Sequence, residues 1–344
     1  MKSIRSYLSL QAIALLTTVL AACSQGETFE MSFGEAVPVR VSASLEAAVQ
    51  SRVVTPVALP VGSEIGVFRV ADTNYKEAAV NMKYVLQKEG WTAENPVYVA
   101  KANAELYACY PYGNAALVEG VPIQAVLRNT VCTQQTDWWY APVSAMQKVN
   151  NLTPDINFDF VKPYSQLSLV IYRGSRYPME CKVTQVQIAL SDGGAINDSQ
   201  FIDLTDGTMG SVQTTKTSYT YPTSGPMHDT GMKVGEAYSD STCNYLFVPQ
   251  ALAAGIELTV TVDGDDYSVT IPHSDLPELK RGIRHMVLIE IRDGVEIAVQ
   301  RVTIVPWQTI DALPVEVHTL PNEAGIEGGS TEDWNENQQP DSYI

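Results

Sequence analysis

The sequence is poor in positive charge, in histidine and in cysteine. Its 344 residues include 22 Lys and Arg against 39 Asp and Glu, which gives a formal net charge of −17. A chain this acidic repels phosphate backbones, so nucleic acid is excluded as a partner. Only 4 His are present, and none of the 5 Cys stands in a Cys-x-x-Cys spacing. We therefore expect no metal site and no cofactor.

Motifs of the common enzyme classes are also missing. The chain has no nucleophile elbow, phosphate-binding loop, dinucleotide fingerprint or zinc-protease motif. The acidic run at 263–266 lacks the spaced ligands of a calcium loop and is interpreted as a hairpin turn. His228 and His273 each stand near an aspartate, but no nucleophile motif accompanies them. We expect no catalytic residues, and hence a protein that is not an enzyme.

What the sequence does contain is β-strand patterning. Apolar residues recur at period two at 156–160, 167–171 and 256–262, and the polar residues between them at 256–262 are typical of a strand with one wet face. Asp263-Gly264 and Asp293-Gly294 stand between such runs, and Asp-Gly is a strong hairpin signal. Helical periodicity is scarce, although Ser274 could cap one or two helical turns. Many short strands with little helix predict an all-β protein built of β-sandwiches.

The N-terminus has the pattern of a bacterial lipoprotein signal. Lys2 and Arg5 precede an uncharged, largely apolar stretch at 8–20, and Leu20-Ala21-Ala22-Cys23 then resembles a lipobox. Residues 1–22 are predicted to be removed, and Cys23 to carry the acyl chains that anchor the protein in outer-membrane lipid. The alternative is an ordinary secretory signal that happens to place a cysteine after the cut.

Composition divides the rest of the chain into four parts. Residues 23–33 are polar and short and are interpreted as a tether. Strand patterns fill 34–160 and 161–320, which we predict to be an N-terminal and a C-terminal β-sandwich domain. Residues 321–344 contain six acidic residues and no Lys or Arg, so we expect a flexible acidic tail.

The four cysteines after Cys23 leave two interpretations open. An exported protein meets an oxidising compartment, where two disulfides could form. Some of these cysteines lie in strand-like segments, where buried free thiols are equally expected. The pairing is not fixed by the sequence for Cys109, Cys132, Cys181 and Cys243.

One aromatic run is the candidate for binding sugar. In a strand, Trp138 and Tyr140 share one face and Trp139 occupies the other. If exposed, these rings could stack on a glycan. The alternative is that one face joins the core and the other covers a sheet edge.

Several short motifs in a fixed order carry a family resemblance. They are the lipobox at Cys23, Ser63-Glu64-Ile65-Gly66-Val67-Phe68, Trp91-Thr92, Asn95-Pro96-Val97-Tyr98, Glu105-Leu106-Tyr107-Ala108-Cys109-Tyr110-Pro111-Tyr112, Phe158-Asp159-Phe160, Gln166-Leu167-Ser168-Leu169-Val170-Ile171 and Ile304-Val305-Pro306-Trp307. In this order the chain resembles the fimbrillin-like proteins of Bacteroidetes, the subunits of type V pili. The resemblance covers residues 32–307.

The resemblance implies a fold and a mode of assembly. The fold is two tandem transthyretin-like Greek-key β-sandwich domains. Family subunits reach the outer membrane as lipoproteins, and a trypsin-like protease cuts after an arginine and removes the first strand. A strand of another pilus subunit then fills the vacated groove by β-strand addition. The protein would be located at the outer membrane and cell surface, in a fimbrium.

Candidate parts for this assembly can be assigned. Arg52 and Arg40 are the candidate cleavage sites, and Arg52 is favoured because a cut there frees the whole strand 37–45. The alternative is that neither is cut and both are surface charges. The candidate donor strand has alternating apolar residues at Leu313, Val315 and Val317. Pro314 weakens it because proline lacks an amide donor, and the same stretch could instead be the last strand of its own domain.

Two functions therefore follow from the sequence. The first is a structural or adhesive subunit of type V fimbriae. The acidic tail departs from a simple donor strand, so stalk, tip and anchor roles stay open. The alternative is a monomeric surface lipoprotein that binds host or dietary glycans through exposed aromatic residues. A host protein receptor is a further candidate partner.

Overall fold

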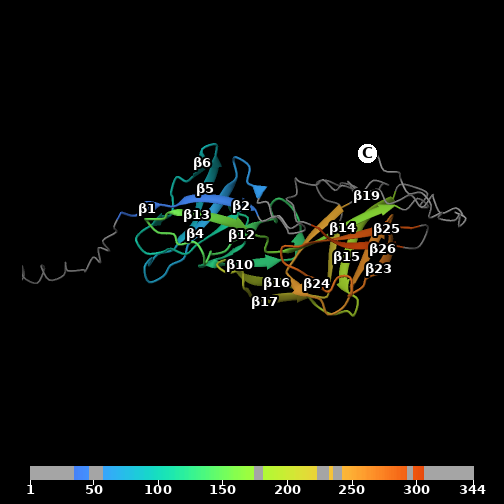
Figure 1. The fold of residues 1–344 in the computed structure, drawn as a ribbon. Coiled ribbons are helices and arrows are strands. Elements are labelled where there is room, and N and C mark those ends of the chain that lie inside the picture. Colours follow the sequence, from blue (N-terminus) through green and yellow to red (C-terminus); the bar gives the residue numbers. More distant parts are fainter. Residues whose placement is uncertain are drawn as a thin grey trace, which may run out of the picture.

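The computed structural model describes residues 35–45, 57–173, 181–222, 232–234, 242–292 and 297–305, and over these the chain folds into β-strands without a helix. The strands form two bodies that lie side by side (Figure 1). In the first half of the chain the strands are β1 (Val37–Pro38), β2 (Arg40–Leu45), β3 (Val57–Ala58), β4 (Glu64–Arg69), β5 (Ala79–Gln87), β6 (Gly90–Thr92), β7 (Tyr98–Val99), β8 (Leu106–Tyr110), β9 (Leu117–Val118), β10 (Val121–Arg128), β11 (Thr130–Val131), β12 (Trp139–Ala141) and β13 (Asp155–Phe160).

The second half of the chain continues in the same way. Its strands are β14 (Ser165–Arg173), β15 (Cys181–Leu190), β16 (Ile196–Asp203), β17 (Met209–Lys216), β18 (Ser218–Pro222), β19 (Met232–Val234), β20 (Thr242–Phe247), β21 (Gln250–Ala251), β22 (Ile256–Val262), β23 (Asp265–Ile271), β24 (Glu278–Leu279), β25 (Arg284–Ile291) and β26 (Ile297–Val305). The expected all-β fold class is therefore confirmed.

The first body packs two sheets around one core. One sheet has the order β12-β8-β4-β5-β6, and the other has the order β13-β2-β3. Apolar side chains from both fill the space between them, among them Ile65, Val67, Leu106, Phe158 and Phe160. On β13 these residues alternate with exposed polar ones, whereas β4 and β8 are buried on both faces, with Phe68, Tyr107 and Cys109 in a second apolar cluster.

The second body is also a two-sheet arrangement. Its sheets have the orders β11-β20-β14-β25-β26 and β18-β15-β22-β23, with β19 also paired to β15. Leu169, Ile188, Leu258 and Ile289 are fully buried between them. The hairpin of β22 and β23 turns at Asp263 and Gly264, which have φ angles of 52° and 99°, as the Asp-Gly signal predicts.

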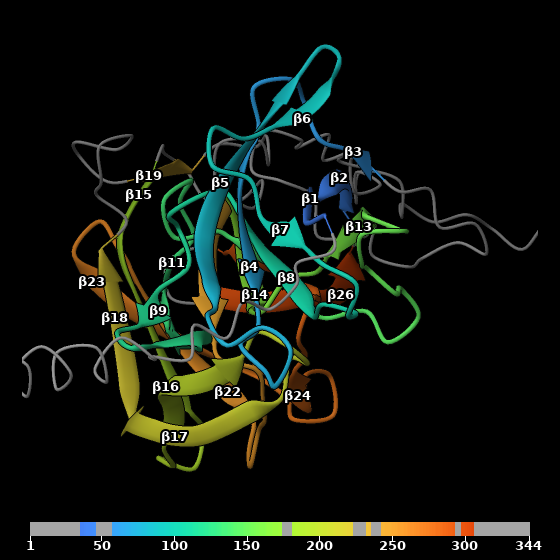
Figure 2. The ribbon, with the colours of Figure 1, turned by 90° about the vertical axis from the view of Figure 1, so that its left-hand side faces the viewer.

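A further sheet joins the two halves of the chain. Its order is β17-β16-β10-β9, so strands from before and after the expected boundary at 160/161 pair directly. Residues of β10 from Gln124 to Arg128 face residues of β16 from Asp203 to Ser199 in antiparallel register. Figure 2 shows β16 and β17 lying side by side in this sheet. The domain boundary stays a prediction, but hydrogen bonds of one sheet cross it.

A buried cluster, which we call the junction core, accompanies this sheet. It contains Phe68, Tyr107, Cys109, Ala125, Leu127, Trp138, Tyr140, Tyr164, Ile202, Leu204, Leu246 and Val248. These residues come from both halves of the sequence. Because all of them are buried, the junction between the halves is packed like a protein interior.

The structure contradicts the predicted helical turns after Ser274 and supports the predicted strand pairing around Asp293-Gly294. The helical turns suggested after Ser274 are wrong, because Glu278–Leu279 is strand β24 and pairs with β21. Leu279 is 1% exposed in that strand, so burial of leucine outweighs the weak helical pattern. The Asp293-Gly294 turn lies outside the described residues, although the flanking strands β25 and β26 pair as predicted, with Ile291 opposite Ile297.

Three of the cysteines are not part of a disulfide. Cys109 is buried, and Cys132 and Cys243 are partly buried. Burial raises the pKa of Cys132 to about 12 and that of Cys243 to about 11, so both are protonated at neutral pH. These three residues therefore follow the interpretation without disulfides, while the side chain of Cys181 lies outside the described residues.

A buried histidine on β25 predicts acid sensitivity. His285 is 4% exposed, and its Nε2 accepts a hydrogen bond from the Lys280 amide at 3.2 Å. Burial and the nearby Lys280 charge lower the pKa of His285 to about 4. Between pH 6.5 and 4 the unfolded chain binds this proton and the folded chain does not. The free energy of unfolding is therefore not reduced by this group above pH 6.5. It decreases as the pH falls from 6.5 to 4, by about 3 kcal/mol in total.

We expect His285→Gln to reduce this loss, because the amide oxygen can accept the same hydrogen bond without titrating. The measurement is urea unfolding of both proteins at pH 7 and pH 4.5. Equal losses of unfolding free energy in the two proteins would show that His285 is not the responsible group.

Candidate functional site

The first described segment of the chain, residues 35–45, contacts three separate neighbours. β1 runs antiparallel to β7, with Val37 opposite Val99, and the Val39 amide donates to the Val97 carbonyl at 2.8 Å. β2 runs parallel to β13, and its last two residues pair with β3. Figure 2 shows β1 and β2 between β7 and β13. A segment at the start of the chain thus completes sheets formed by residues far along it.

One face of this segment belongs to the core of the first body. Val39 and Leu45 are buried, and Val37, Val41 and Ala43 pack against the same cluster. On β13 the inward residues are Ile156, Phe158 and Phe160, all buried. The parallel register brings the two apolar rows together, with Ile156 opposite Val41, Phe158 opposite Ala43 and Phe160 opposite Leu45.

The opposite face of the pair carries a row of polar contacts. Arg40 Nε and Nη2 donate to the two Asp155 carboxylate oxygens, each at 2.7 Å. Ser42 Oγ contacts Asn157 Oδ1 at 3.0 Å. Ser44 Oγ donates to Asp159 Oδ1 at 2.8 Å. Every outward residue of β2 therefore meets a polar partner at its own register position on β13.

The ion pair in this row is exposed to solvent. The side chains of Arg40 and Asp155 are 69% and 68% exposed. The hydrogen bond and charge of Asp155 raise the pKa of Arg40, and the hydrogen bond from Arg40 lowers the pKa of Asp155. Exposed pairs contribute little to stability. The pair instead favours one register, because a shift of one residue would turn Arg40 inward.

The two candidate cleavage sites differ in position. Arg40 is the first residue of β2 and is engaged with Asp155. Arg52 lies outside the described residues, between the end of β2 at Leu45 and the start of β3 at Val57. A cut after Arg52 would separate β1 and β2 from the remaining strands, whereas a cut after Arg40 would leave most of β2 attached.

The aromatic run predicted to bind sugar is buried. Trp138, Trp139 and Tyr140 are 1%, 4% and 2% exposed. The predicted alternation is present, because Trp138 and Tyr140 join the junction core while Trp139 joins the core of the first body. The predicted glycan contact at these residues is therefore wrong. Both faces of the run are covered, so none of the three rings is available for stacking on a sugar.

A buried ion pair beside this run was not predicted. Lys162 Nζ contacts Asp137 Oδ1, and both residues are buried. The ammonium also lies 4.0 Å from the centroid of the Trp139 ring. Burial raises the pKa of Asp137 and lowers that of Lys162. One lysine and one aspartate separated by 25 positions give no sequence signal that they meet.

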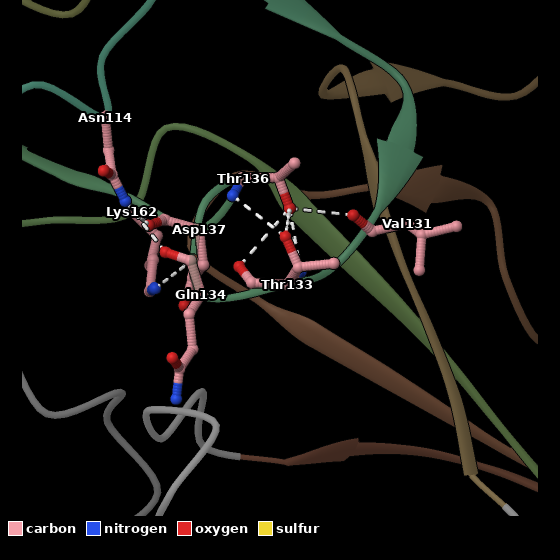
Figure 3. Close-up of polar contacts among 7 residues, drawn as sticks. All are labelled: Asn114, Val131, Thr133, Gln134, Thr136, Asp137 and Lys162. Carbon is pink, nitrogen blue, oxygen red and sulfur yellow. Dashed lines mark hydrogen bonds and ion pairs between the residues drawn. The ribbon is translucent and has the colours of Figure 1, made fainter. Parts of the chain in front are cut away.

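Polar contacts hold the turn that presents Asp137. Thr136 Oγ1 donates to the Val131 carbonyl at 2.8 Å and accepts from the Thr133 amide at 2.8 Å. Asn114 Nδ2 donates to the Gln134 carbonyl at 2.8 Å. Figure 3 shows these contacts around the Lys162–Asp137 pair. The arrangement connects the turn after β11 to the segment after β13, and we interpret it as structural.

Several predicted residues are not placed. Cys23, Leu313, Val315, Val317 and the tail 321–344 lie outside the described residues. Within the described ranges, no three metal-ligating side chains of His, Cys, Asp or Glu are grouped for a metal ion. The same part of the chain has no helix of the length and apolarity that crossing a membrane requires.

Comparison with known proteins shows which family and which solved structures the chain is similar to. A family model described as fimbrillin-like matches residues 51–307. The chain is similar to the crystal structure of a candidate cell adhesion protein from Bacteroides ovatus, with 16% identity, a TM-score of 0.56, and coverage of 78% of this chain and 97% of the other. A second such protein, from Bacteroides uniformis, has 18% identity, a TM-score of 0.55, and coverage of 79% and 99%. At these identities the structures support the fold alone. No curated protein sequence matches the chain.

Proposed function

This chain belongs to the fimbrillin-like family, and we propose that it is a subunit of outer-membrane type V fimbriae assembled by strand exchange. Family membership makes it a fimbrial or adhesive protein of the cell surface rather than an enzyme.

Export as a lipoprotein is the first step. We propose that residues 1–22 are removed and that Cys23 carries the lipid that holds the subunit at the outer membrane. The support is the basic start, the apolar stretch and the Leu20-Ala21-Ala22-Cys23 sequence. Acyl chains contribute about 0.8 kcal/mol per buried methylene, so several chains on one cysteine anchor a protein firmly.

The observation that carries strand exchange is the placement of β1 and β2. Together they supply one apolar row to the core of the first body. β1 pairs with β7, and β2 pairs in parallel with β13. Along the chain they are linked to β3 by residues 46–56. Cleavage after Arg52 would allow them to leave, and β13 would then present unpaired backbone groups beside Ile156, Phe158 and Phe160. Such an edge with an apolar groove accepts a strand from another subunit.

Blocking this cleavage tests the proposal. We expect surface-sheared wild-type protein to begin at Val53 and to form polymers on a denaturing gel without heating. Arg52→Ala should keep the N-terminus at Cys23 and abolish polymers, because the groove stays filled. Arg40→Ala is the matched control, and it should leave cleavage and polymers intact. Polymers built from chains that all retain acylated Cys23 would contradict the proposal.

The glycan-binding alternative receives no support from the structure. It depends on exposed aromatic residues, and the candidate run Trp138, Trp139 and Tyr140 is buried. We therefore do not propose it.

A further inference from the structure

Two segments, one near each end of the chain, have nearly the same short sequence. Residues 35–42 read Glu-Ala-Val-Pro-Val-Arg-Val-Ser, and residues 311–318 read Asp-Ala-Leu-Pro-Val-Glu-Val-His. The alanine, the proline and both later valines are identical, and the first and third residues are conservative exchanges. The one reversal of charge places Glu316 where the first copy has Arg40. Residues 311–318 lie outside the described residues, so this comparison rests on their sequence.

We propose that residues 311–318 of one subunit take the place of residues 35–42 in a second copy of this chain, residue for residue. The inference rests on the proposed removal of the first strand. It goes further by fixing the register of the candidate donor strand and the charge that this strand brings.

The apolar row of the repeat fits the vacated positions. In the structure Val37, Val39 and Val41 face the core of the first body, and Val39 is 4% exposed. In the proposed register Leu313, Val315 and Val317 take these positions. Two of the three side chains are unchanged, and the third adds one methylene at a partly buried site, so the incoming strand restores nearly the same buried volume.

The proline in the repeat is accommodated by the pairing of β1. Pro38 stands opposite Tyr98, and the next residue, Val39, donates its amide to the Val97 carbonyl. Because hydrogen-bonded and non-hydrogen-bonded pairs alternate in an antiparallel ladder, Pro38 occupies a position where no amide is needed. Pro314 would occupy the same position. The proline that weakened residues 313–317 as a general donor strand is therefore compatible with this groove in this one register.

The reversed charge sets a preference between the two strands. Arg40 forms two hydrogen bonds with Asp155, whereas Glu316 in the same place would bring two carboxylates together. Opposite charges across a strand pair stabilise it, and like charges destabilise it by a similar amount. The original segment is therefore favoured over its replacement at this position. The groove keeps its own first strand until cleavage removes it.

Disulfide trapping tests the register. One copy of the chain carries Glu316→Cys and the other carries Asp155→Cys, and both are cut after Arg52 before mixing. Directly paired residues on neighbouring strands lie about 5 Å apart, which suits a disulfide. The control replaces Asp155→Cys with Asp159→Cys, on the same exposed face but about 13 Å further along the strand. We expect a disulfide-linked dimer with Cys at 155, little with Cys at 159, and none from uncut protein.

The outcomes separate this inference from the proposed function. If the cut protein keeps its N-terminal segment and forms no oligomers, strand exchange itself fails. If oligomers form but the control at 159 links as well as the position at 155, or neither links, the register is wrong and the inference is overturned. Substitutions at these exposed positions leave the core of the first body untouched, and equal melting temperatures of the uncut variants check this.

A second measurement addresses the charge. A peptide of residues 309–320 should compete with a labelled peptide of residues 33–46 for binding to the cut protein. The substitution Glu316→Arg in the 309–320 peptide should strengthen its binding about two- to tenfold. Weaker or equal binding of the Glu316→Arg peptide would contradict the role of Asp155. Failure of the 33–46 peptide itself to bind would instead count against the groove.

Discussion

Trp138→Ala is expected to lower the free energy of unfolding by about 3–5 kcal/mol, the usual range for removing a buried tryptophan. Trp138 is 1% exposed and is the largest of the fully buried side chains. Its ring meets Tyr164 edge to face, with centroids 6.2 Å apart and planes at 86°, and Tyr140 at 6.4 Å. The substitution would open a cavity in the junction core, where both halves of the chain meet.

Urea unfolding of the purified chain measures this effect. Trp138→Phe is the matched variant, because it keeps an aromatic ring against Tyr164, and we expect a smaller loss than for alanine. A loss below about 1 kcal/mol for Trp138→Ala, typical of exposed sites, would mean that the ring is available at the surface. In that case the sugar-stacking interpretation of residues 138–140 would have to be reconsidered.

Lys162→Met is expected to cost about 3–5 kcal/mol, because it leaves the Asp137 carboxylate buried without the ammonium that it contacts. Methionine preserves most of the length of the lysine side chain and its packing on Trp139, so the effect reports charge rather than volume. Burial already raises the pKa of Asp137 with the lysine present. Without the lysine, the carboxyl group is expected to be still harder to ionise.

A second substitution separates the ion pair from the packing around it. In Lys162→Met combined with Asp137→Leu, no buried charge remains at the pair, and we expect most of the lost stability to return. Chemical denaturation of the wild type, both single variants and the double variant gives the coupling energy. If the double variant is as unstable as Lys162→Met alone, the loss comes from the fit of the side chains and not from the unpaired carboxylate.

Local patterns predicted the parts of the fold that depend on neighbouring residues. The turn at Asp263-Gly264 follows because both residues tolerate positive φ. The alternation along Ile256–Val262 follows because one face is buried. The division of Trp138 and Trp139 between two faces follows from strand geometry alone, whereas their burial does not. Whether a second layer covers the outer face depends on distant segments, here Tyr164, Leu204 and Leu246.

Pairings between distant strands were beyond the reach of the sequence. The parallel pairing of β2 with β13 joins residues more than a hundred positions apart, with Arg40 and Asp155 as one example. Alternating apolar residues show that each strand has an inner face, but they do not say which strand lies beside which. The expected boundary near residue 160 illustrates the same limit. A gap in strand patterning is visible, but the pairing of β10 with β16 across it is not.

The sheet that joins the two halves has a mechanical consequence. Segments between domains usually allow relative motion unless a large apolar interface prevents it. Here any bending at residues 161–165 would have to shear the β10–β16 ladder and open the junction core. The subunit would then transmit tension and torque as one stiff rod, and the compliance of a fibre built from it would reside in the joints between successive subunits.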